Sequence, residues 1–442
     1  MGLSRSLSIG TSSLRAHQQR FDVISNNLAN ANTLGYKSER ANFQEQFNQV
    51  YRQGSSPALE SGIGGRNPLQ FGLGVKLGSI QQDMTQGSIE TTNRALDLAL
   101  QGEGYFVYKD RGQELYSRAG AINHDSEGFL VDSGTGALLQ GYNVAVDNRG
   151  YIRKDTQGIN VLEGGYSDLR ISKDIISPPY QTQNVSMKGN LNSAMAVGDS
   201  RKMSINIIDS AGGAHTLELT FAKSATANQF DVSATLDGSD LTLSGAAVTF
   251  NADGTLNTPL TLSATAADLN SAIGSTNHLF DDVSTPAKDL TIKLGDANNV
   301  MGGLTSFAMG NNATIYAQDG SAAGSLVELN VDDEGKIWGS FSNGRDELLG
   351  QVALAKFAND DGLIRRGGNM FDKSPNSGEP VVGRVGEALT ATRVQGNSLE
   401  QSNVDMTIQF TDMISTQRAF EAAARTITVS DQLLAETTQL KR

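Results

Sequence analysis

The side chains best suited to metal binding or proton transfer are few and scattered along this chain. The sequence has no cysteine among its 442 residues and only four histidines. These are His17, His124, His215 and His278. None of them has a second histidine four residues away, the spacing that places two zinc ligands on one face of a helix. The sequence therefore predicts no zinc site.

Two acidic segments resemble the start of a calcium-binding loop. Residues 123–128 and 330–335 place oxygen-bearing side chains at alternate positions before a glycine. Such a loop requires a glutamate at its twelfth position, where this chain has Gly134 and Phe341. Hairpin turns are the better interpretation. No Gly-Lys-Ser/Thr loop for phosphates is present, and no carboxylate pair stands out for glycoside hydrolysis. We therefore expect no catalytic, cofactor or metal site, and no enzyme.

The charge balance excludes further classes of partner. Lysine and arginine number 35 against 48 acidic residues, which gives a net charge of −13. Nucleic-acid binding requires a basic stripe, and no such cluster is present. No apolar run approaches the roughly 18 residues of a membrane span, so no membrane insertion is expected. The first thirty residues have no continuous apolar core and thus no conventional cleavable signal peptide, so we expect any export to use another route.

Most of the chain has the pattern of short strands joined by tight turns. Its 48 glycines exceed its 8 prolines, and hairpin signals recur at residues 125–128, 147–150, 251–254 and 332–335. Between about 150 and 315 the composition shifts toward Ser, Thr, Ala, Asn and Asp, which indicates an inserted β domain. The fold class predicted is mainly β with α-helical termini.

Apolar residues recur every seven positions at both ends of the chain. The first row comprises Leu7, Leu14, Phe21 and Leu28, with Ile24 beside it. The second row comprises Met406, Met413, Phe420, Ile427 and Leu434, with Phe410 beside it. These rows predict helices at about 3–31 and 402–440, each with a narrow seam that requires a partner helix. We expect the two helices to pair and to be fully ordered only in an assembly. An ordinary helical hairpin that closes a globular fold is the alternative.

The chain after the first predicted helix is harder to assign. Phe43, Phe47 and Val50 fall on one side of a helical period, which predicts a second helix at about 39–51. Residues 54–74 are rich in Gly, Ser and Pro and predict a loop or an extended arm.

Particular motifs at the two ends resemble one family. Residues 25–38 include Asn26, Asn27, Asn30, Thr33, Gly35, Tyr36 and Lys37. Residues 399–405 include Ser402, Asn403, Val404 and Asp405, and the motif continues to Gln417 and Arg418. With segments 74–107 and 342–380, these stretches resemble the bacterial flagellar rod and hook proteins, the axial proteins of the flagellum.

Within that family the resemblance implies a hook subunit. Hook proteins carry a large inserted outer domain, whereas distal rod proteins are much shorter, so the insert at 150–315 favours the hook. The arm at 52–74 is similar in placement to an extension of distal rod proteins, and a distal rod subunit is therefore the alternative. A secreted β-rich adhesin is the alternative from a different class.

The resemblance implies a structural role. Many copies would form a helical homopolymer, a flexible hollow tube that transmits motor torque to the filament as a universal joint does. The implied partners besides further copies are the distal rod, hook-cap and hook–filament junction proteins and the type III flagellar export apparatus. The implied location is extracellular, in the hook of the bacterial flagellum, and no cofactor is implied.

Four parts are expected along the chain. Residues 1–33 and 400–442 form a helical, tube-forming domain that pairs as an inner coiled-coil layer. Residues 34–74 and 386–399 connect it to the β domains. Residues 75–149 and 316–385 form a discontinuous first β domain, and residues 150–315 form a second β domain inserted into the first.

Overall fold

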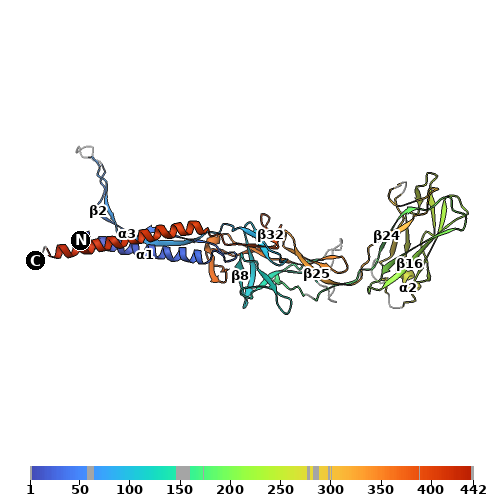
Figure 1. The fold of residues 1–442 in the computed structure, drawn as a ribbon, viewed down its shortest axis with the longest axis horizontal. Helices are drawn as coiled ribbons and strands as arrows, with labels where there is room; N and C mark the ends of the chain where they lie inside the picture. Colours follow the sequence, from blue (N-terminus) through green and yellow to red (C-terminus); the bar gives the residue numbers. More distant parts are fainter. Residues whose placement is uncertain are drawn as a thin grey trace. The chain divides into compact units, whose positions relative to one another are not determined.

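The computed structural model describes residues 2–56, 64–145, 160–172, 174–275, 279–281, 288–296, 299, 301–387 and 389–439. It is mainly β with one long helix at each end (Figure 1). The chain divides into two compact units. Unit 1 comprises Met1–Ser172, Leu329–Gly339 and Leu348–Arg442, and unit 2 comprises Lys173–Glu328 and Ser340–Glu347. The predicted fold class is confirmed, whereas the finer four-part division stays a prediction.

Unit 1 contains the two long helices, α1 (Gly2–Ala29) and α3 (Met406–Gln439), and a short 3₁₀ turn, η2 (Asp360–Gly362). Its strands before the insert are β1 (Glu39–Glu45), β2 (Asn48–Arg52), β3 (Leu69–Gly72), β4 (Val75–Gln82), β5 (Ile89–Thr91), β6 (Leu98–Gln101), β7 (Tyr105–Asp110), β8 (Gln113–Ser117), β9 (Ile122–His124), β10 (Leu130–Asp132), β11 (Leu138–Asn143) and β12 (Ser167–Asp168). After the insert follow β28 (Leu354–Lys356), β29 (Ile364–Gly367), β30 (Met370–Asp372), β31 (Val381–Gly383), β32 (Arg393–Gly396) and β33 (Ser398–Glu400). Three strands extend over residues of both units: β25 (Gly324–Val331), β26 (Lys336–Phe341) and β27 (Asp346–Val352).

The β core of unit 1 joins segments that are far apart in the sequence. Strand β7 pairs with β8, β11 and β28, and β11 pairs with β27, so strands from both sides of the insert lie in one sheet. Aromatic rings fill its core, where Tyr105, Tyr116 and Phe371 are buried with Phe357. The rings of Tyr116 and Phe357 meet edge to face at 4.8 Å, an arrangement that aromatic pairs favour.

Unit 2 is a separate β structure with its own core. Its elements are β13 (Ile176–Ser177), β14 (Asn184–Asn190), β15 (Ser200–Ile208), β16 (Ala214–Lys223), β17 (Gln229–Leu236), β18 (Ser239–Leu241), β19 (Ala247–Phe250), β20 (Leu256–Thr258), β21 (Thr261–Ala264), α2 (Ala266–Ala272), β22 (Leu290–Lys293), β23 (Leu304–Thr305) and β24 (Thr314–Gln318). One sheet has the order β15-β16-β17-β19-β20, and another has the order β21-β22-β14-β23. Leu217, Leu219 and Phe221 alternate inward along β16, as a half-buried strand requires.

The predicted hairpin turns are confirmed where the structure describes them. The turns at 125–128, 251–254 and 332–335 each join two antiparallel strands. In the last, Asp332 Oδ1 accepts hydrogen bonds from the backbone N of Glu334 and Lys336 at 2.9 Å each, so this carboxylate closes a turn. Within the described ranges no group of three or more acidic or histidine side chains gathers to hold a metal. The turn at 147–150 and His278 lie outside the described residues.

The predicted helix at 39–51 is wrong. Strand β1 instead pairs antiparallel with β4, from Glu39 opposite Gln82 to Glu45 opposite Val75, and β2 pairs with β3. Backbone pairing with a segment 30 to 43 residues away outweighs the local helical spacing of apolar residues, as tertiary context often does. Phe47 and Val50 are exposed on the resulting ribbon.

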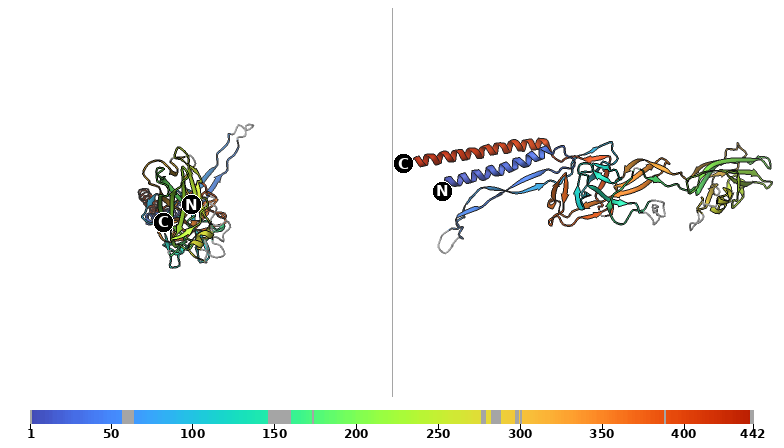
Figure 2. Two further views of the ribbon diagram at one scale, coloured as in Figure 1. Left: turned by 90° about the vertical axis from the view of Figure 1, so that its right-hand side faces the viewer. Right: turned by 90° about the horizontal axis from the view of Figure 1, so that it is seen from below.

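The two predicted terminal helices are confirmed, and they lie side by side (Figures 1 and 2). Asp405 is the N-cap of helix α3. Its Oδ1 accepts hydrogen bonds from the backbone N of Thr407 at 2.8 Å and of Ile408 at 3.1 Å. Shortly after α1 ends, Gly35 has a φ of 64°, the left-handed conformation that glycine adopts without strain. In the described part of the chain, neither helix has the length and apolar character of a membrane span.

Candidate assembly surface

The motif residues that follow α1 tie its end to the rest of unit 1. Asn27 is fully buried, and its Oδ1 accepts from Glu39 N at 2.9 Å and from the Tyr36 hydroxyl at 3.2 Å. Its Nδ2 donates to Glu39 O at 2.7 Å and to Gln409 Oε1 at 3.2 Å. One amide thus joins α1, β1 and α3. Asn30 donates to Asn26 O at 2.9 Å and accepts from the Thr33 hydroxyl, which shapes the turn after the helix.

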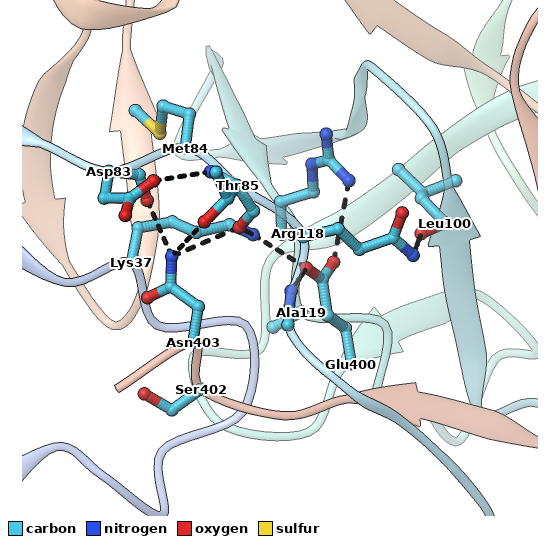
Figure 3. Close-up of polar contacts among 12 residues, drawn as sticks. Lys37, Asp83, Met84, Thr85, Leu100, Arg118, Ala119, Glu400, Ser402 and Asn403 are labelled. Atoms are coloured by element: carbon cyan, nitrogen blue, oxygen red, sulfur yellow. Dashed lines mark hydrogen bonds and ion pairs between the residues drawn. The ribbon is translucent and has the colours of Figure 1, made fainter. Parts of the chain in front are cut away.

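A buried ionic cluster of Lys37, Arg118 and Glu400 lies beside that turn (Figure 3). Lys37 Nζ donates to Glu400 Oε1 and to the Thr85 carbonyl, both at 2.7 Å. Arg118 Nη1 lies 3.6 Å from Glu400 Oε2. The side chains of Lys37 and Glu400 are 1% and 0% exposed. Burial lowers the pKa of Lys37, although the carboxylate of Glu400 opposes this effect by favouring the charged amine.

Asn403 completes the connection from the other chain end (Figure 3). Its Oδ1 accepts from Ser38 N at 2.8 Å, and its Nδ2 donates to the carbonyls of Asp83 at 2.8 Å and Thr85 at 3.2 Å. Gly35 N also donates to the Glu400 carbonyl at 2.8 Å. The segment that follows α1 and the segment that precedes α3 are therefore hydrogen-bonded to each other, and the second is also bound to the residues that follow β4. These motif residues serve the internal structure of one chain.

Small side chains form the seam between α1 and α3. On α3 the buried residues are Thr416, Ala423 and Ser430, which are spaced by seven. On α1, Gly10 and Asn27 lie against α3, next to Ile427 and Gln409, and Ala16, Val23 and Ile24 are also buried. Gly10 leaves room for Ile427, since a Cβ at this glycine would lie 2.8 Å from Ile427 Cγ1. Arg20 of α1 and Asp412 of α3 form an ion pair of 3.0 Å between the two helices.

The predicted apolar rows coincide with this seam only in part. Ile24 is buried, whereas Leu7, Leu14, Leu28, Met413, Ile427 and Leu434 are half-buried. Phe21, Met406, Phe410 and Phe420 are 38%, 50%, 48% and 40% exposed. Met413 and Phe420 lie beside α1 without being covered by it, since both line a space that opens between the two helices.

The remaining motif residues are placed as follows. Ser402 Oγ accepts from Val404 N at 3.3 Å, and Val404 is half-buried just before Asp405. Gln417 and Arg418 are exposed on α3. Arg118, Gln409 and the specific part played by Glu400 were not predicted from the sequence. The row of Thr416, Ala423 and Ser430 was not predicted either, and its only signal in the sequence is the seven-residue spacing of three small residues.

A cleft of about 470 Å³ opens between the two helices. We call it the α1/α3 cleft, and its lining residues are His17, Gln18, Phe21, Met413, Thr416, Gln417 and Phe420. The cleft and the exposed apolar side chains near it form an uncovered surface on the helix pair. The geometry suits association with another apolar surface.

Four family descriptions match successive parts of the chain. Residues 7–37 match "Flagella basal body rod protein", and residues 99–187 match "Flagellar hook protein FlgE/F/G D1 domain". Residues 183–321 match "Flagellar basal body protein FlaE D2 domain", and residues 395–440 match "Flagellar basal body rod FlgEFG protein C-terminal".

Relatives that match the chain over its full length are hook proteins. The chain is 33% identical over 479 residues to the flagellar hook protein FlgE of Treponema pallidum, with both chains covered completely. It is 34% identical over 462 residues to that of Borreliella burgdorferi, which covers 99% of this chain and 100% of the relative. The chain belongs to the flagellar hook protein FlgE family. The hook protein of Escherichia coli is 31% identical over 438 residues, with 96% of each chain covered.

Membership in the hook protein family confirms the resemblance and the predicted structural role. The chain is a structural subunit of the bacterial flagellar hook, and neither a distal rod subunit nor an adhesin is favoured, because the full-length relatives are named as hook proteins. The family is one of structural flagellar proteins, as predicted.

Proposed function

We propose that copies of this chain polymerise through the outward faces of α1 and α3 into a hollow tube that carries motor torque. The observation that carries this proposal is the placement of large apolar side chains on the helix pair. The buried positions of α3 hold small residues, while Phe21, Phe410 and Phe420 remain 38%, 48% and 40% exposed. Full burial of an exposed phenylalanine contributes about 1.5–3 kcal/mol, and covering the remaining exposed part of each ring contributes a fraction of this, which favours association.

The proposed packing is heterologous, which means that one surface of each copy meets a different surface of the next. Such contacts continue into open filaments when the rotation between copies does not close a ring. In this arrangement the terminal helices line the inside of the tube, and the β structure lies outside. Polar contacts between small side chains of unit 2 are individually weak. Weak outer contacts can slide when the tube bends, while the inner apolar contacts hold.

The same proposal identifies the flagellar proteins that the polymer would contact. The two ends of the tube would meet the distal rod and the hook–filament junction proteins, and growth would proceed under the hook cap. The chain would reach the growing end, outside the cell, through the flagellar export apparatus. Family membership supports these partners, since a hook polymer must be continuous with the structures at both of its ends.

The experiment compares two charge-introducing substitutions on α3. Phe420→Glu places a carboxylate on the exposed apolar face, and Gln432→Glu places the same charge at an exposed polar position. We expect Phe420→Glu to remain soluble and folded but to form no tubes, because a charge in a desolvated apolar contact is costly. Gln432→Glu should polymerise as the unsubstituted chain does.

Polymerisation is measured by sedimentation and electron microscopy, and folding by circular dichroism. Tubes of normal length from Phe420→Glu would refute the proposed surface. Failure of both variants, with folded monomers, would show that α3 tolerates no added charge anywhere and would also count against a specific apolar face.

A further inference from the structure

The α1/α3 cleft contains a hole of the kind that receives a side chain in a coiled coil. Its α3 residues are Met413, Thr416, Gln417 and Phe420, at positions i, i+3, i+4 and i+7. In knobs-into-holes packing, four residues at this spacing surround one side chain of a facing helix. The chain's own α1 lines one wall with His17, Gln18 and Phe21 and leaves the space open at about 470 Å³. The geometry therefore suits a side chain from a further helix.

The chemistry of the hole suits an apolar side chain. Phe21, Met413 and Phe420 supply its apolar walls. Burial, with a smaller effect of Arg20, lowers the pKa of His17, so the imidazole is neutral at pH 7. The Thr416 hydroxyl has no hydrogen-bond partner among the described residues. It can turn onto the carbonyl one helical turn earlier, as threonines do in helices, so an apolar side chain can lie over it.

The opposite side of α3 presents apolar side chains that fit such a hole. Val429 and Leu433 are 53% and 44% exposed and four residues apart, so they stand next to each other on the helix surface. With 3.6 residues per turn, these two side chains lie about 170° around the helix from the centre of the hole. One helix thus carries a hole on one side and knobs on the other.

We propose that Val429 and Leu433 of a second copy insert into the α1/α3 cleft, so that α3 helices lie side by side in one continuous layer. This inference rests on the proposed polymerisation through the terminal helices. Copies in a helical polymer point the same way along its axis, so the neighbouring α3 helices are parallel. The knobs are centred about 14.5 residues beyond the hole, which gives an axial offset between the two copies of about 22 Å.

The test uses engineered disulfides, which the absence of native cysteine makes unambiguous. The pair Gln417→Cys and Val429→Cys joins hole to knob. Within one helix these positions are about 18 Å apart, too far for an internal disulfide. The control pair is Gln417→Cys and Gln432→Cys, in which the second cysteine lies off the knob side and is again out of internal reach. Both variants are assembled into polymer and then oxidised.

We expect the hole-to-knob pair to convert monomer into a ladder of covalent multimers that a reductant reverses, while the control pair stays monomeric. A polymer without this ladder would overturn the inference but leave the proposed polymerisation intact. Failure of the unsubstituted chain to polymerise would sink the proposed function itself. Cross-linking of Gln417→Cys to Ile9→Cys or Tyr51→Cys instead would assign the cleft to α1 or to the β2–β3 ribbon.

If the hole-to-knob pair does not polymerise, the unsubstituted polymer is imaged at side-chain resolution by electron cryomicroscopy. Finding Val429 and Leu433 of the neighbouring copy in the cleft, at an offset of about 22 Å, supports the inference. A different helix or a different offset in the cleft refutes it.

Discussion

The buried ionic cluster gives a sharp prediction for the stability of unit 1. Glu400→Gln keeps the size of the side chain and removes its charge. Lys37 and Arg118 would then be two buried cations without an anion between them, because Lys37 lies 2.7 Å and Arg118 3.6 Å from this carboxylate. Lys37→Met, in contrast, leaves Arg118 to neutralise Glu400. Glu400→Gln therefore leaves buried charges without a partner of opposite sign, whereas Lys37→Met does not.

The expected losses follow from these contacts. Removing one partner of a buried ion pair costs about 3–5 kcal/mol. Glutamine retains an acceptor for Gly87 N, which donates to Glu400 Oε1 at 2.9 Å, so we expect Glu400→Gln to cost about 3 kcal/mol. Lys37→Met removes the hydrogen bonds of Lys37 to Glu400 and to the Thr85 carbonyl but leaves Glu400 beside Arg118, so we expect a cost of about 2 kcal/mol. The double variant should lose about 1–2 kcal/mol less than the sum, because the two side chains interact directly.

The assay uses the fluorescence of Trp338 during unfolding in urea. This is the only tryptophan in the sequence, and it lies in unit 1, where its Nε1 donates to Asp332 Oδ2 at 3.0 Å. The midpoint and slope of the transition give the free energy of unfolding of unit 1. Equal losses for Glu400→Gln and Lys37→Met, or a loss below about 1 kcal/mol for Glu400→Gln, would refute the role assigned to the cluster.

Two further predictions concern other buried polar groups. Asn27→Ala should destabilise unit 1 by about 3 kcal/mol, because it leaves both backbone groups of Glu39 without their side-chain partner. The control Asn26→Ala, at an exposed position, should cost under about 1 kcal/mol. Equal costs of the two substitutions in the Trp338 assay would contradict this account. In unit 2, burial alone would lower the pKa of His215, but its hydrogen bonds to Asp237 and Asp209 outweigh burial and raise this pKa above 6.5. The stability from His215 is therefore complete below about pH 6.5 and is lost as the pH rises through the raised value, so calorimetry should show the unfolding temperature of unit 2 falling over that interval. His215→Gln should remove this dependence, and an unchanged pH profile in the variant would rule the histidine out.

The terminal helices and the turns could be predicted because their signals are local. Asp332 and Gly335 form a hairpin turn through contacts a few residues apart, and the seven-residue row from Met406 marks a helix whatever surrounds it. The direction of that row was harder to predict. A strict heptad pattern does not show that the seam within one chain belongs to Thr416, Ala423 and Ser430, since small residues contribute little to an apolar periodicity.

The β1–β4 ribbon and the buried ionic cluster depend on contacts between distant residues. Phe43 and Phe47 suggest a helix until β4 supplies the antiparallel partner of β1. Lys37 and Glu400 are 363 residues apart, and a single sequence contains no signal that pairs them. The segments that contain both residues were recognised by resemblance, but their roles required the structure.

The position of Lys37 and Glu400 has a mechanical consequence. Lys37 lies on the segment that leaves α1, and Glu400 lies on the segment that enters α3, so one ion pair bridges the two connections between the helices and the β strands. A pull on either helix reaches both connections at the same point. Tension can thereby be shared between two covalent paths before it enters the sheet, and separating the two connections would break a contact from which water is excluded.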